Sequence, residues 1–170
     1  MRAFLDRLYL ACGAIAATFL ALIGLLILTS IISRWMGVYV PGLNAFSGYA
    51  MAASSFFALA WTFQTGGHIR VNIALGALKG RARWAAELWC LGVAGAAAAY
   101  IAWYVAKMTL VSLDFGDVSE SADKTPLWIP QTALAIGSAV FALAVWDRFV
   151  VTLSSGEVAP EPDPTGQAKE

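Results

Sequence analysis

The sequence predicts an all-helical integral membrane protein with four transmembrane helices. Of its 170 residues, 59% are hydrophobic and only 13% are charged, whereas a soluble domain carries about 25% charged residues. The apolar residues also occur in long blocks, because neither Leu8–Ser33 nor Thr125–Trp146 contains a charged residue. About 20 apolar helical residues cross the hydrocarbon core of a bilayer. This composition excludes a soluble enzyme with a large polar cleft, and the balance of 11 basic and 11 acidic residues excludes a nucleic-acid binder.

Turn-forming residues divide the apolar sequence into four predicted spans, at about residues 8–33, 45–66, 84–107 and 126–146. The turn Pro41-Gly42-Leu43-Asn44 separates the first two spans, and Gly66-Gly67 ends the second, since proline, glycine and asparagine favour turns and glycine ends helices. We expect residues 1–153 to form one membrane domain. Residues 154–170 are rich in proline and acidic residues and predict a disordered cytoplasmic tail.

Lysine and arginine residues set the predicted orientation. With both termini in the cytoplasm, most basic residues lie on the inner side: Arg2, Arg7, Arg70, Lys79, Arg81, Arg83, Arg148 and Lys169. Only Arg34, Lys107 and Lys124 lie outside. The positive-inside rule favours this orientation. The seven tryptophans fall near predicted span ends, where indole prefers the headgroup boundary.

No cluster of residues in the sequence suggests catalysis, a cofactor or a metal site. Cys12 and Cys90 stand alone in apolar segments, and His68 is the only histidine, so neither a haem ligand pair nor a zinc site can be assembled from them. We therefore predict that the protein is not an enzyme. Charged residues lie near span ends rather than at the membrane centre, where ion paths and proton relays place them, so the chain alone is predicted to be a poor transporter.

The segment after the second span leaves two interpretations open. His68 is either an interfacial histidine near a helix C-terminus or a docking residue for a partner subunit. Ile69–Gly80 is too short to cross a bilayer. It forms either a short amphipathic helix in the inner interface or an ordinary basic loop.

Two further patterns lie in the second half of the chain. Four acidic residues, Asp114, Asp117, Glu120 and Asp123, recur every three residues, a spacing that does not match a calcium loop. A solvated acidic face is favoured over contact with a soluble partner, and metal binding ranks third. The third span also carries small residues at helical spacing, namely Gly92, Gly95, Ala96 and Ala99. Such a seam allows close helix packing in lipid, either within the bundle or against a second protein.

The end of the second span resembles a known family signature. In Ala60–Asn72, a glycine-histidine pair precedes an alternating apolar and polar run, as in the small membrane subunit of tripartite ATP-independent periplasmic (TRAP) transporters. Thr125–Gln131 resembles the start of that family's final helix. The resemblance covers about residues 5–150, and the residues that carry it are candidate partner contacts: Arg34, Gly67, His68, Arg70, Asn72, Pro126, Trp128 and Pro130.

This resemblance implies a sodium-coupled uptake system in the bacterial inner membrane. A large membrane subunit would carry the substrate and sodium sites, an extracytoplasmic binding protein would deliver an organic anion, and the small subunit would brace the large one. Many family members open the second span with a glutamate, where this chain has Asn44-Ala45-Phe46-Ser47, so the resemblance leaves the substrate open. The alternative is a self-assembling four-helix multidrug exporter, which needs a carboxylate within its first span. Leu8–Ser33 contains none.

Overall fold

The computed structural model describes residues 2–65, 81–121 and 124–155, and in these ranges it is helical. The helices are α1 (Arg2–Trp35), α2 (Leu43–Gln64), α4 (Arg81–Phe115) and α5 (Trp128–Ser155). Among the described residues there is no strand, only an isolated antiparallel bridge between Val118 and Pro126. The all-helical prediction is therefore confirmed. The expected interfacial segment and residues 156–170 of the expected tail lie outside the described residues.

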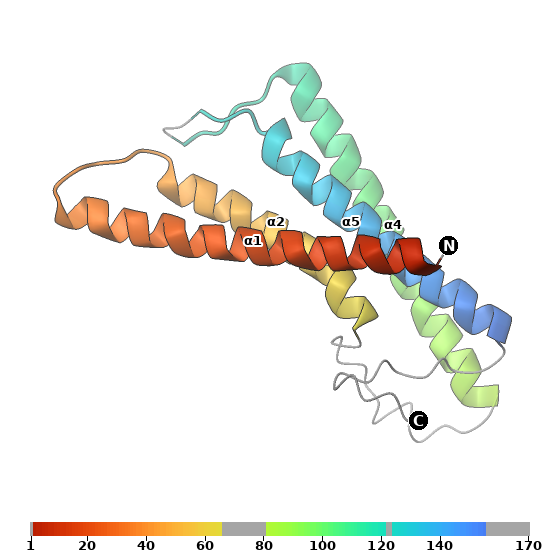
Figure 1. Cartoon of the computed structure of the whole chain (residues 1–170). Helices are drawn as coiled ribbons and strands as arrows, with labels where there is room; N and C mark the ends of the chain where they lie inside the picture. Colours follow the sequence, from red (N-terminus) through yellow and green to blue (C-terminus); the bar gives the residue numbers. More distant parts are fainter. Residues whose placement is uncertain (1, 66–80, 122–123, 156–170) are drawn as a thin grey trace, which may run out of the picture.

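Two antiparallel hairpins, α1–α2 and α4–α5, make up the bundle (Figure 1). The main contacts join α1 to α2, α2 to α5 and α5 to α4, so α2 and α5 are the inner helices. The turns that close both hairpins lie at one end, which we call the loop end. The N-terminus, the start of α4 and the end of α5 lie at the opposite end (Figure 1), which we call the terminal end.

Small and aromatic side chains fill the junction between the hairpins. Tyr9, Ala60 and Ala144, from α1, α2 and α5, form one buried cluster. A second cluster of Cys12, Ala16 and Phe57 joins α1 to α2. The hydroxyl of Ser54 in α2 also donates a hydrogen bond of 2.9 Å to the carbonyl oxygen of Ala16. Small residues at these positions let the helix backbones approach closely, which is how helices associate in lipid.

Three of the helices, α1, α4 and α5, are long and apolar enough to cross a membrane. The fourth, α2, has 22 residues and no charged residue, but it is not among the helices that length and composition mark as able to cross. Helix α2 packs against both α1 and α5. Its buried positions are mostly alanines, Ala50, Ala53 and Ala60, together with Phe57. A membrane crossing by α2 stays a prediction.

The helices also extend beyond the predicted spans. Helix α4 continues past Lys107 to Phe115, and α5 continues past Trp146 to Ser155, so the first two residues expected in the tail belong to α5. Apolar blocks locate the hydrocarbon core, whereas helix ends depend on packing and capping. Packing continues at the terminal end of this hairpin, where the indole N–H of Trp84 donates a 3.0 Å hydrogen bond to the carbonyl oxygen of Thr152.

Candidate functional site

In the described part of the chain, charged residues lie toward the helix ends or in the α4–α5 connection. Helix α1 has none between Arg7 and Arg34, and α2 has none at all. Helix α4 has none between Glu87 and Lys107, and α5 has none before Asp147. No three histidine, cysteine or acidic residues in the described ranges are grouped so that they could hold a metal ion. The candidate sites are therefore surfaces and hollows rather than clusters of ionisable groups.

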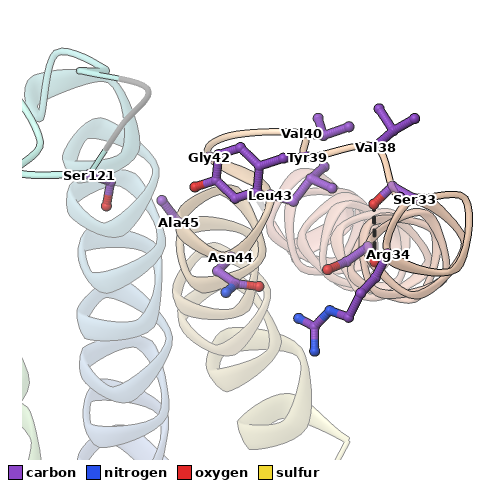
Figure 2. Close-up of a pocket in the computed structure, with 12 residues that line it drawn as sticks. Ser33, Arg34, Val38, Tyr39, Val40, Gly42, Leu43, Asn44, Ala45 and Ser121 are labelled. Carbon is purple, nitrogen blue, oxygen red and sulfur yellow. Dashed lines mark hydrogen bonds between the residues drawn. The ribbon is translucent and has the colours of Figure 1, made fainter.

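A polar hollow of about 510 Å³ opens at the loop end between α1 and α2 (Figure 2). Its polar lining includes Arg34 at the end of α1, Asn44 at the start of α2 and Ser121 from the α4–α5 connection, and none of the described residues that line it is acidic. Figure 2 shows the guanidinium of Arg34 extending from α1 toward the side of α2 that carries Asn44. Arg34 is exposed, so the hollow presents an accessible positive charge.

The backbone around this hollow follows from the local sequence. Gly42, which precedes α2, has a φ of 84°, a left-handed conformation that glycine adopts without steric cost. The first hydrogen bond of the helix runs from the N–H of Phe46 to the carbonyl oxygen of Gly42 at 3.0 Å. The N–H groups of Leu43, Asn44 and Ala45 precede that bond and have no partner within the helix. All three residues line the hollow.

An apolar groove of about 350 Å³ lies between α1, α2 and α5 in the half of the bundle nearer the loop end. Its lining is almost entirely hydrophobic: Phe19, Leu22 and Leu26 from α1, Phe46, Tyr49, Ala50 and Ala53 from α2, Ile129, Pro130 and Ala133 from α5, and Thr125 just before α5. One wall is stabilised by a hydrogen bond of 2.7 Å from the hydroxyl of Tyr49 to Oγ of Ser119.

The structure separates the candidate partner contacts into three groups. Arg34 lines the hollow and Pro130 lines the groove. Pro126 forms the bridge with Val118, and Trp128 is the first residue of α5. The remaining four, Gly67, His68, Arg70 and Asn72, lie outside the described residues. The part played by Asn44 in the hollow was missed, because the sequence marked this residue only as part of a turn.

The small-residue seam of α4 divides between two surfaces. A Cβ atom placed on Gly95 would lie 3.3 Å from Cε2 of Trp146, and one on Gly92 would lie 3.5 Å from Cε2 of Phe149, so both glycines face α5. Ala96 and Ala99 are exposed. Ala96 lies on the wall of an open groove of about 540 Å³ near the terminal end, together with Trp89. Half of the seam thus packs within the chain and half lies on its surface.

The acidic residues at the loop end are on the surface. Asp114, Asp117 and Glu120 are exposed, and Asp123 lies outside the described residues. The connection is held by backbone hydrogen bonds, from the N–H of Ser119 to the carbonyl of Thr125 at 2.8 Å and from the N–H of Leu127 to the carbonyl of Asp117 at 2.9 Å. These carboxylates are accessible to solvent.

Comparison with known protein families identifies the family of this chain. A family model described as the DctQ component of the tripartite ATP-independent periplasmic transporters matches residues 23–154, from the middle of α1 to the end of α5. A comparison with curated proteins found no match. The family is a transporter component rather than an enzyme family, and its membrane setting agrees with the three helices able to cross a bilayer. The matched region takes in Arg34, the seam and the whole α4–α5 hairpin. The chain belongs to the DctQ family, the small membrane component of TRAP transporters.

Proposed function

We propose that this chain braces the large transport subunit of a sodium-coupled TRAP system in the bacterial inner membrane. The system would take up an organic anion that an extracytoplasmic binding protein delivers. Membership of the DctQ family supports the place of the chain in such a system. The observation that carries the bracing role is the lack of charged residues in the middle of the described helices.

A path for sodium and an organic anion needs polar groups near the middle of the membrane. Transporters supply them as ionisable side chains, or as the free backbone groups of interrupted helices. In this chain α1, α2, α4 and α5 run without interruption over their full lengths, and Pro130 lies in the first turn of α5 rather than at its centre. Continuous helices with apolar centres suit a fixed wall against which another subunit moves.

The proposed arrangement has four crossings, with the terminal end in the cytoplasm and the loop end outside. Helix α2 has 22 residues, which at 1.5 Å per residue gives about 33 Å and exceeds a hydrocarbon core of about 30 Å. The positive-inside rule supports the orientation, because Arg7, Arg81, Arg83 and Arg148 all belong to the terminal end.

Contact with the large subunit is proposed for the Gly67–Asn72 motif and for the exposed half of the seam, Ala96 and Ala99. The motif follows α2 in the sequence, and exposed small residues permit the close approach of a second protein's helix. The alternative for His68 is that it only lies in the membrane interface.

Solute uptake into proteoliposomes tests this function. Vesicles would hold this chain alone, the large subunit alone, or both, with binding protein and an inward sodium gradient. We expect uptake only where both subunits are present, and a loss of uptake when potassium replaces sodium. Clear transport by this chain alone would contradict the bracing role and favour the multidrug-exporter alternative. Full activity of the large subunit alone would show that no brace is needed.

A further inference from the structure

We propose that the loop end of the α1–α2 hairpin binds one phospholipid. Its phosphate would lie in the polar hollow beside Arg34, and an acyl chain would lie in the apolar groove that follows along the same two helices. The proposal concerns a lipid ligand and does not depend on how the chain serves the transporter.

The polar half of this site has the chemistry of a phosphate acceptor. Arg34 supplies a guanidinium, whose planar donors match phosphate oxygens in pairs. Asn44 and Ser30 add an amide and a hydroxyl to the lining. Glu120 precedes Ser121 in sequence but does not line the hollow, so among the described residues no carboxylate competes there for the positive charge.

The apolar half follows the polar half along the same two helices. On α1, the groove is lined by Phe19, Leu22 and Leu26, and the hollow by Ser30, Ser33 and Arg34. Steps of three or four residues keep side chains on one face of a helix, and Ser30 lies four residues, about 6 Å along the axis, beyond Leu26. On α2, Ala45 lines the hollow, and Tyr49 and Ala53, which follow it at steps of four residues, line the groove.

The presence of an apolar groove next to the polar hollow favours a phospholipid over other anions. A free phosphate or a carboxylate of another protein would use the hollow alone and leave the groove unused. A phospholipid is charged at one end and apolar at the other, and would use both. The depth also fits, because the hollow lies where α1 ends at Trp35 and α2 begins, and helix ends with tryptophan lie at the headgroup level.

Native mass spectrometry of the delipidated full chain, titrated with phosphatidylglycerol, tests the site. Two pairs of variants, each with a control, test the hollow and the groove separately. Arg34→Gln removes the cation of the hollow, and Lys107→Gln removes another exposed cation of the same half of the bundle as its control. Leu22→Trp fills the groove, and Leu25→Trp adds the same side chain at an exposed α1 position that does not line it.

We expect Arg34→Gln to weaken phosphatidylglycerol binding about tenfold, the effect of losing one charge-assisted contact. Leu22→Trp should weaken it as well, while both controls bind as the original chain does, and inorganic phosphate should not displace the lipid. Equal losses in Arg34→Gln and Lys107→Gln would overturn the proposal in favour of general electrostatic attraction. Displacement by inorganic phosphate, with no effect of Leu22→Trp, would overturn it in favour of a free-anion site. Unchanged lipid binding in Arg34→Gln, with reduced recovery of a partner protein, would overturn it in favour of a protein carboxylate.

Discussion

Gly137 of α5 lies directly against Phe56 of α2: a Cβ atom placed on Gly137 would come within 2.9 Å of Cβ and 3.0 Å of the backbone carbon of Phe56. This is the closest approach of helix backbones that any described glycine makes to a neighbouring helix. It lies where the two hairpins meet, because α2–α5 packing is the main connection between them.

The first prediction concerns this contact. Gly137→Val should destabilise the protein by about 1–3 kcal/mol, the usual cost of adding methyl groups to a packed interior, because the atoms in the way are Cβ of Phe56 and the α2 backbone beside it, which cannot rotate aside. Thermal unfolding in detergent measures the effect, with a thiol-reactive dye that reports exposure of the buried Cys12 in a Cys90→Ser background. Gly48→Ala is the control, since nothing lies within 4 Å of a Cβ there. Equal melting temperatures for Gly137→Val and the control would contradict this packing.

The second prediction concerns the seam of α4. Gly95→Leu should lower the melting temperature by several degrees, because the new side chain would collide with Trp146, whose ring already lies 3.3 Å from the position of a Cβ. Ala99→Leu should leave the melting temperature of the isolated chain unchanged, since Ala99 is exposed. If Ala99→Leu reduces co-purification of the large subunit, the outer half of the seam contacts that partner. Equal destabilisation by both variants would contradict the separation of the seam into two surfaces.

The fold was predictable from the sequence because apolar blocks and turn residues are local signals. The blocks Leu8–Ser33 and Thr125–Trp146 and the turn at Pro41-Gly42 place three helices without any tertiary information. The helix ends were not predictable in this way. Helix α4 runs to Phe115, past Lys107, because a charged residue ends an apolar block without ending a helix.

The candidate site was predictable only in part. Arg34 was identified from the resemblance to the small TRAP subunit, but its neighbours in the hollow come from two other segments, α2 and the α4–α5 connection. Asn44 and Ser121 carry no motif and are separated from Arg34 along the chain. The seam shows the same limit, because helical spacing groups Gly92, Gly95, Ala96 and Ala99 on one side of α4. Only the position of α5 decides which of them are covered.

The third prediction concerns orientation. Single cysteines at Glu120 and at Ser154, both exposed positions, would be introduced after Cys12 and Cys90 are replaced by alanine. A membrane-impermeant maleimide added to intact cells should modify Glu120→Cys and leave Ser154→Cys unmodified, because the basic residues of the terminal end favour the cytoplasm. Permeabilised cells are the control and should show modification at both positions. The reverse pattern in intact cells would contradict the proposed topology.

The last prediction concerns the motif that follows α2. If His68 and Arg70 contact the large subunit, changing both to alanine should reduce recovery of that subunit when this chain is pulled down. Loss of polar contacts reduces the free energy of binding by about 1–3 kcal/mol, and about 1.4 kcal/mol corresponds to a tenfold change in affinity. The double variant Lys107→Ala and Lys124→Ala is the control, because it removes two exposed cations that lie outside the motif. A contact is supported if the His68 and Arg70 double variant recovers less of the large subunit while the control does not, and if the melting temperature of the isolated chain is unchanged. If recovery and sodium-driven uptake both stay unchanged, His68 lies in the interface without a partner, and the docking role must be assigned to the exposed half of the seam.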